Sequence, residues 1–405
     1  KAELCYLESK ELKEKLHATN NIDYCGTLVN LGKLYYNMAY FEKAEPILLE
    51  AKNIFETILK NTNHPFYFNC LTALSLVYNQ AGQFEKGELI ILENLSLIEK
   101  SSGNNNEKYA GEVNNMGVLY DNMGNFDRAE KYYQKALEIK EKLSGKENIN
   151  YVSTLSNLGI LYGKTRDYQK SEKYLLESIK ILESIGLTES PTYSVALNNL
   201  GLVYRGKNQF EEATQQYSKS LELDEKLERT NQPKYAMTLT NLGFLEVEKG
   251  NYDKAEVLYL KAKTLFNKMF TAFSPDYLIN LFNLGELYSI KGDFVKSENF
   301  YSELSEANQI MLNKAVPHLS ENELQKYLAL FANRQDALFS MAHKANRTKN
   351  VTSDIQNKIN STCFNNNLFF KGFLLNVANQ TRRLVSSDSV ANEKYNRLNA
   401  YLRRL

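Results

Sequence analysis

A row of asparagines recurs at a constant spacing and offers hydrogen-bonding chemistry. From Asn115 onward the row repeats every 42 residues, and Ala73 is the one gap in it. A carboxamide donates and accepts at once, so it can bond the backbone of a peptide whatever the side chains of that peptide are. We therefore predict that these asparagines bind peptide. The row consists of Asn30, Asn115, Asn157, Asn199, Asn241 and Asn283.

Further polar residues stand beside this row. Asn114 and Asn198 each precede a row member, and Arg205 or Lys164 could reach an acidic partner. A structural role is the alternative: each asparagine bonds a neighbouring helix and holds the repeats together, because a buried amide needs partners in either case. The two roles are compatible at different repeats.

Residues that could catalyse a reaction do not form a known pattern. The chain has no H-E-x-x-H, no phosphate-binding G-x-x-x-x-G-K-[ST] and no G-x-S-x-G. His343 and Cys363 lie on either side of a polar connector, whereas a Cys/His pair needs contact and an orienting third group. We expect no catalysis, no metal and no cofactor in this chain.

The four cysteines are scattered and show no C-x-x-C spacing. This pattern argues against a disulfide framework and a zinc site and is typical of a reducing compartment, so we expect a cytoplasmic protein.

The asparagine row follows a repeat that fills most of the chain. A Leu-Gly pair or a close relative of it recurs with a step of 43 residues once and 42 residues five times. A strict period of this size predicts stacked helix pairs, and hence an all-α solenoid. The pairs begin at Leu31, Leu74, Met116, Leu158, Leu200, Leu242 and Leu284.

Each repeat predicts two helices. In the first helix the glycine lets two backbones approach, and a tyrosine three residues later is expected to fill the gap beside it. The second helix is expected to open on an aromatic residue, with a small residue three positions on that admits the neighbouring helix. The aromatic residues are Phe41, Phe84, Phe126, Tyr168, Phe210, Tyr252 and Phe294. Glycines such as Gly124, Gly250 and Gly292 are expected to end the first helices.

Three regions are expected. Residues 1–18 are interpreted as the second helix of a truncated repeat, residues 19–315 as seven repeats, and residues 316–405 as a helical connector to a missing C-terminal domain. Pro317 is expected to end the array, and Ser320 with Glu323 to form a capping box. Helices are then expected at about 355–385 and 390–405.

Net charge restricts the partners. The chain carries +1 overall, with eleven Lys/Arg against three Asp/Glu from residue 344 to residue 405. Lys and Arg alternate there with apolar residues at helical spacing, so a solvated face or an acidic protein surface is favoured over nucleic acid. No apolar run approaches the ~20 residues that span a bilayer, and no membrane partner is expected.

The sequence L-G-x-x-Y, followed by aromatic-x-x-small, resembles the tetratricopeptide repeat, and the 42-residue period resembles the kinesin-light-chain variety. The resemblance implies a right-handed superhelix whose first helices line a concave groove for a protein or peptide partner.

Two later segments, Leu319–Leu328 and Leu368–Val385, resemble the part that joins repeats to protease in bacterial TPR-CHAT caspase-like peptidases. This resemblance implies a regulatory region with its catalytic domain in cis, and it transfers no catalytic residue to this chain. The alternatives are a free-standing adaptor and a repeat-type response-regulator or phosphatase module.

Overall fold

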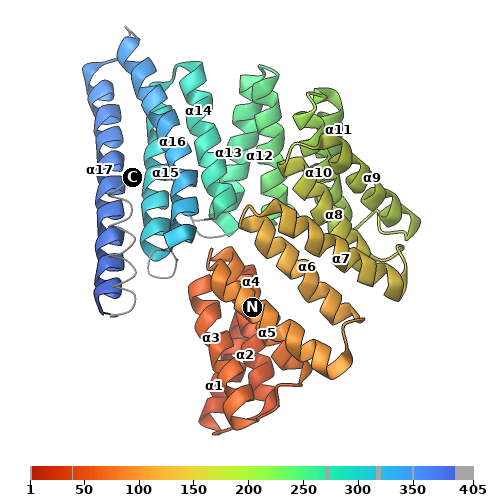
Figure 1. Cartoon of the computed structure of the whole chain (residues 1–405). Coiled ribbons are helices and arrows are strands. Elements are labelled where there is room, and N and C mark those ends of the chain that lie inside the picture. Colours follow the sequence, from red (N-terminus) through yellow and green to blue (C-terminus); the bar gives the residue numbers. More distant parts are fainter. Residues whose placement is uncertain (1, 39, 270–273, 316–320, 349–350, 388–405) are drawn as a thin grey trace, which may run out of the picture. The chain divides into compact units, whose positions relative to one another are not determined.

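The computed structural model describes residues 2–38, 40–269, 274–315, 321–348 and 351–387. These residues form helices joined by short turns, and no strand occurs among them (Figure 1). The all-α repeat fold predicted from the period is therefore confirmed. The chain divides into two compact units, Lys1–Asn280 and Leu281–Leu405.

Helices alternate between the first and second member of a pair. The first helices are α2 Ile22–Asn37, α4 Pro65–Gln80, α6 Glu107–Asn122, α8 Ile149–Lys164, α10 Pro191–Gly206, α12 Pro233–Glu248 and α14 Pro275–Lys291. The second helices are α3 Phe41–Asn53, α5 Phe84–Ser102, α7 Phe126–Ser144, α9 Tyr168–Ser184, α11 Phe210–Lys226, α13 Tyr252–Met269 and α15 Phe294–Ala315. All seven second helices begin at the aromatic residue that the sequence predicts.

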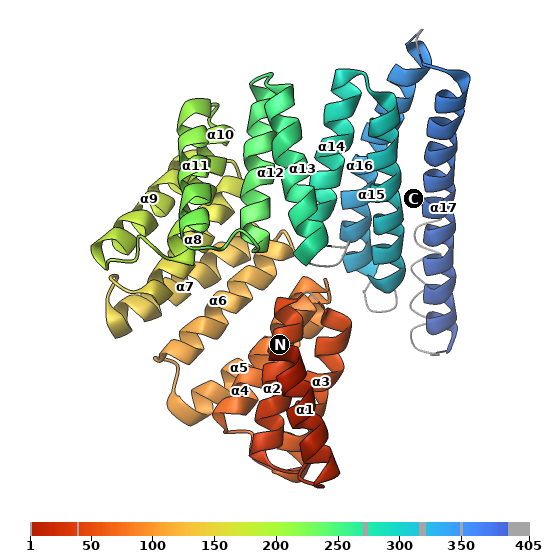
Figure 2. The same cartoon turned by 180° about the vertical axis from the view of Figure 1, so that it is seen from behind.

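Within the first unit, each first helix packs against its own second helix and against the next first helix (Figures 1 and 2). Consecutive members of the series α2, α4, α6, α8, α10 and α12 are in contact. One turn of each first helix can therefore form part of a surface that continues from repeat to repeat.

In every first helix except α4, which has Ser75 at this position, the glycine accommodates a side chain of the second helix. A Cβ atom added at Gly117 would lie 2.6 Å from the ring of Tyr133, and one at Gly201 would lie 2.7 Å from Tyr217. Tyr133 and Tyr217 are fully buried. The expectation that the tyrosine three residues after the glycine fills this space is wrong, since the side chain that fills it comes sixteen residues later.

The predicted small residues of the second helices are buried and allow close packing. Two of them are serines that also bond the first helix of their own repeat. Ser171 Oγ donates to the carbonyl of Gly159 at 2.7 Å, and Ser297 Oγ donates to the carbonyl of Gly285 at 2.8 Å.

The turn after each first helix from α4 to α14 takes the left-handed conformation. Gly124, Gly250 and Gly292 have φ values of 72°, 79° and 76°, which confirms their predicted role as helix stops. Arg166 and Asn208 occupy the same place in their repeats with φ values of 63° and 61°. The turn is thus kept where the sequence has no glycine.

The single 43-residue step has a local structural cause. Helix α3 continues directly into a π-helical turn, η1, at Ile54–Ile58. The amide of Leu59 bonds the carbonyl of Ile54, five residues earlier, at 2.9 Å. A π turn takes up one residue more than an α turn. The extra residue of this repeat is therefore absorbed inside its second helix.

Helix α1, Ala2–Lys15, contacts α2 in the way that α7 contacts α8. Lys13 Nζ donates to the hydroxyl of Thr27 at 2.9 Å, and Lys140 Nζ donates to that of Thr154 at 2.7 Å. Helix α1 therefore occupies the place of a second helix preceding α2.

The second unit also contains α16 Glu321–Arg347 and α17 Ser353–Ser387, which pack on each other and on α15. Pro317, Ser320 and the expected helix at 390–405 lie outside the described residues, and the region limits at residues 18 and 315 stay predictions. In the described segments, no helix combines the length and apolar character that a membrane crossing needs.

Candidate peptide-binding surface

The predicted asparagines all lie in first helices, and their exposure differs. In the first unit Asn30 is exposed, Asn115, Asn157 and Asn241 are half-buried, and Asn199 is buried. We call these five residues the amide row. Asn283, in the second unit, is also buried.

Two members of the amide row bond an asparagine of the preceding repeat. Asn157 Nδ2 donates to Asn114 Oδ1 at 3.2 Å, and Asn241 Nδ2 donates to Asn198 Oδ1 at 3.0 Å. At these two positions the asparagine therefore bonds a neighbouring helix, as the structural role would require. Each amide has two donor hydrogens and an oxygen that accepts twice, so a single bond leaves further capacity for a ligand.

The other members are engaged to different degrees. Asn115 Nδ2 donates to Glu112 at 3.4 Å, within the same helix. The Nδ2 atoms of Asn198 and Asn199 are buried and lack a hydrogen-bond partner. Buried donors without a partner are rare in folded proteins. Helix α10 therefore holds two buried donors that the contacts between repeats do not use.

A second set of contacts joins the same helices one turn beyond the glycines. Asn122 Nδ2 donates to Asn79 Oδ1 at 3.0 Å, and Lys164 Nζ donates to Asp121 Oδ2 at 2.8 Å. In each pair the partners are 43 residues apart. These contacts could have been predicted from the sequence, because the residues 43 apart are two carboxamides in one pair and a lysine with an aspartate in the other.

Arg205 makes the third contact of this kind. Its Nε lies 3.7 Å from the carboxylate of Glu248, again 43 residues away, and its guanidinium lies 4.5 Å from the ring centroid of Phe244. The cations expected to meet an acidic partner, Lys164 and Arg205, are therefore both paired within the chain.

A buried carboxyl group lies beside the amide row. Glu112 is 4% exposed, and the hydroxyl of Thr72 in α4 donates to it. Its Oε2 atom has no partner. Burial raises the pKa of Glu112 to about 7, while hydrogen bonds from Thr72, Asn115 and Asn94 oppose the rise. The contact between α4 and α6 thus contains a group that titrates near neutral pH.

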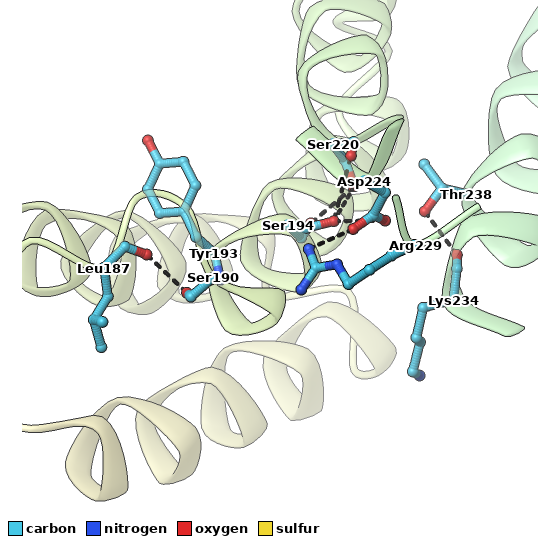
Figure 3. A network of polar contacts seen from close by, with 9 residues as sticks. All are labelled: Leu187, Ser190, Tyr193, Ser194, Ser220, Asp224, Arg229, Lys234 and Thr238. Carbon is cyan, nitrogen blue, oxygen red and sulfur yellow. Dashed lines mark hydrogen bonds and ion pairs between the residues drawn. The ribbon is translucent and has the colours of Figure 1, made fainter. Parts of the chain in front are cut away.

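A buried polar cluster that the sequence analysis missed joins α10, α11 and the turn before α12 (Figure 3). Ser194 Oγ donates to Asp224 Oδ2 at 2.9 Å and lies 3.0 Å from Ser220 Oγ, while Arg229 Nη2 donates to Asp224 Oδ1 at 2.6 Å. Ser194 and Ser220 are buried. The cluster gives the buried carboxylate of Asp224 hydrogen bonds from α10 and from the turn before α12.

The cysteine and histidines singled out in the sequence have ordinary surroundings. Cys363 is buried, and burial raises its pKa to about 11, which is opposite to the shift an active thiol needs. His343 is exposed and lies 3.2 Å from a guanidinium nitrogen of Arg347. His64 caps α4 by accepting the amide hydrogen of Phe66 at 3.2 Å. Among the described residues, no cluster of three or more His, Cys, Asp or Glu could hold a metal ion.

The repeat geometry agrees with a family-model comparison. Residues 109–184, 165–226 and 234–309 match the model of the tetratricopeptide repeat. These residues carry tetratricopeptide repeats. Such repeats stack into extended surfaces that bind other proteins. No curated protein matches the sequence.

Several solved structures are similar to this chain at low sequence identity. A Rap protein, crystallised in complex with competence and sporulation factor, is 15% identical with a TM-score of 0.52, over 87% of this chain and 99% of the other. BtubC (BKLC) from P. vanneervenii is 20% identical with a TM-score of 0.46, over 58% and 92%. Two structures of a putative kinesin light chain of P. anserina, with nearly identical TPR-like repeats, are 16% identical with TM-scores of 0.41 and 0.42, over 50% of this chain and 95–96% of theirs. At 15% identity the likeness to the Rap protein shows a common fold alone.

Proposed function

We propose that this chain is a protein-interaction scaffold whose first helices bind an extended segment of a partner. One observation carries the proposal: consecutive first helices are in contact, and four of the five in the series from α4 to α12 present an asparagine at the same turn. The amide row offers regularly spaced donors and acceptors to a peptide backbone. The Rap protein with a similar fold holds competence and sporulation factor, which is consistent with this use of the fold.

Removing three central amides tests the proposal. Peptides of twelve residues are selected from a random display library on the intact chain, labelled with fluorescein and titrated by anisotropy. The variant with Asn157→Ala, Asn199→Ala and Asn241→Ala loses three amides at ~0.5–1.5 kcal/mol each, so its affinity falls by roughly 10- to 1000-fold.

A matched control removes three exposed amides from second helices. Gln134→Ala, Gln169→Ala and Gln215→Ala together leave the affinity unchanged, because these side chains lie on α7, α9 and α11. Far-UV circular dichroism verifies that both triple variants keep their helices. Wild-type affinity in the folded asparagine variant would make the amide row purely structural.

We also propose a narrower role, in which the scaffold is the sensing and regulatory region of a caspase-like peptidase. Its support is the sequence resemblance of Leu319–Leu328 and Leu368–Val385 to the TPR-CHAT connector. The adaptor role needs no further domain and fits the repeats equally. Sequencing the gene past the codon for Leu405 separates the two: a downstream α/β domain with a His and Cys pair supports the peptidase role, and a stop codon supports the adaptor.

A further inference from the structure

An apolar row runs beside the amide row. One residue after each glycine position, five successive first helices carry a large apolar side chain that is half-buried. We call this set the apolar row: Leu76, Val118, Ile160, Leu202 and Phe244. Four members stand three residues after a member of the amide row, and residues three apart are neighbours on a helix surface. Four of these repeats therefore place an apolar side chain beside an amide, and in the fifth Leu76 stands beside Ala73.

The charges next to the apolar row are balanced within the chain. Lys164 is 2.8 Å from Asp121, whose side chain is 8% exposed, and Arg205 lies between Phe244 and Glu248. A charged partner would have to compete with these pairs and lose its own hydration at an apolar surface. The surface therefore selects an uncharged segment.

The repeat spacing restricts the conformation of that segment. Packed helices lie ~8–10 Å apart, and one turn of polyproline II, three residues at ~3.1 Å, advances ~9 Å. Polyproline II returns every third side chain to the same face, whereas a β-strand returns every second. Polyproline II also makes no internal hydrogen bonds, so its backbone groups are free to pair with amides.

We propose that the partner is an uncharged polyproline II segment with an apolar side chain at every third position. One turn of the segment faces one repeat, and five contacts require roughly 13 residues. The apolar side chains contact the apolar row, and the backbone between them bonds the amide row. This inference rests on the proposed function and adds the chemistry and register of the partner.

Three synthetic peptides of 13 residues test the register on the intact chain by fluorescence anisotropy. The first peptide has leucine at every third position, five in all, and a Pro-Ser pair between successive leucines. The second has the same composition with leucines at every second position. The third replaces each serine of the first by glutamate. We expect the first to bind at least tenfold more tightly than either of the others.

Two variants locate the contact. Ile160→Gln lowers the affinity for the first peptide at least tenfold, because Ile160 belongs to the apolar row. Leu176→Gln leaves its affinity unchanged, because Leu176 is 42% exposed on the second helix α9. Equal effects of the two variants would overturn the assignment of this surface.

The outcomes for the register and for the proposed function are distinguishable. Equal binding of the first two peptides, or tighter binding of the acidic one, overturns the inference. If display-selected peptides depend on Asn157, Asn199 and Asn241 but lack the third-residue period, the proposed function stands and the inference fails. If no selected or synthetic peptide binds the folded chain, both fail.

Discussion

Two glycines of helix α6 should respond in opposite ways to the same substitution. A Cβ atom at Gly117 would lie 2.6 and 2.7 Å from two ring carbons of Tyr133, whereas a Cβ atom at Gly111 would meet nothing within 4 Å. Tyr133 is 1% exposed, so its ring has no open space into which to move. Gly117→Ala must displace a packed side chain, and Gly111→Ala need not.

The magnitude follows from two contributions. Both substitutions gain ~1 kcal/mol of helix propensity, because alanine replaces glycine inside the same helix. Only Gly117→Ala adds overpacking, which costs ~1–3 kcal/mol. We therefore expect Gly111→Ala to raise the free energy of unfolding by ~1 kcal/mol. The free energy of unfolding of the Gly117→Ala variant should be ~1–3 kcal/mol lower than that of the Gly111→Ala variant.

Equilibrium urea unfolding measured by circular dichroism gives the two free energies. Because a repeat array can unfold in parts, hydrogen exchange of the amides in α6 and α7 localises the effect. A double-mutant cycle with Tyr133→Ala should show favourable coupling, since the truncated side chain removes the clash. Equal stability of the two alanine variants, or a coupling energy of zero, would refute this explanation of the repeating glycine.

Three further predictions concern a turn, a carboxyl group and the thiols. Arg166→Gly should raise the free energy of unfolding by ~0.5–1 kcal/mol in urea titrations, because φ at Arg166 is 63° and a left-handed conformation strains a residue with a Cβ. Because the folded pKa of Glu112 is about 7 against an ordinary 4.5, its contribution to stability is fully present below pH 4.5 and falls by up to ~1.4 kcal/mol per pH unit as the pH rises to 7. Glu112→Gln should remove this slope, and an unchanged pH profile would assign the slope to other groups. Ellman's reagent should modify the exposed Cys5 of the native chain quickly and leave Cys25 and Cys70 unmodified until urea is added, because burial raises their pKa values to about 11 and 12.

The periodic features of the fold could be predicted from the sequence because they are local. The starts of the second helices and the glycine stops depend on residues within one repeat. The π turn at Ile54–Ile58 was not predicted, although the 43-residue step is its trace in the sequence. A period shows that one residue is extra and does not show where the helix absorbs it.

Contacts between repeats were harder to predict because they depend on how far one first helix is shifted along the next. The bond from Asn157 to Asn114 spans 43 residues and not the 42-residue period, so the row members do not pair with one another. The same shift brings Lys164 to Asp121. Equivalent positions in two repeats are visible in the sequence, whereas the offset between packed helices appears only in the structure.

Another contact explains why α12 has Glu246, and not a tyrosine, three residues after its glycine. Tyr162 donates to Glu130 of the preceding repeat at 2.7 Å, and Tyr120 donates to Glu88 at 2.5 Å. Where Glu246 replaces the tyrosine, the preceding repeat has Thr214 in place of the glutamate. The tyrosine and its glutamate partner are thus replaced together. A glutamate at position 214 would have placed a second carboxylate opposite Glu246.

Photo-crosslinking of the 13-residue peptide with leucine at every third position tests most directly whether the first helices form the binding surface. Benzoylphenylalanine is placed at Ser153, which is exposed on α8 two turns before Ile160, or at Leu176 on α9. We expect a crosslinked product from position 153 that unlabelled peptide competes away, and none above background from position 176. Crosslinking from position 176 alone would place the partner on the second helices and contradict binding by the first helices.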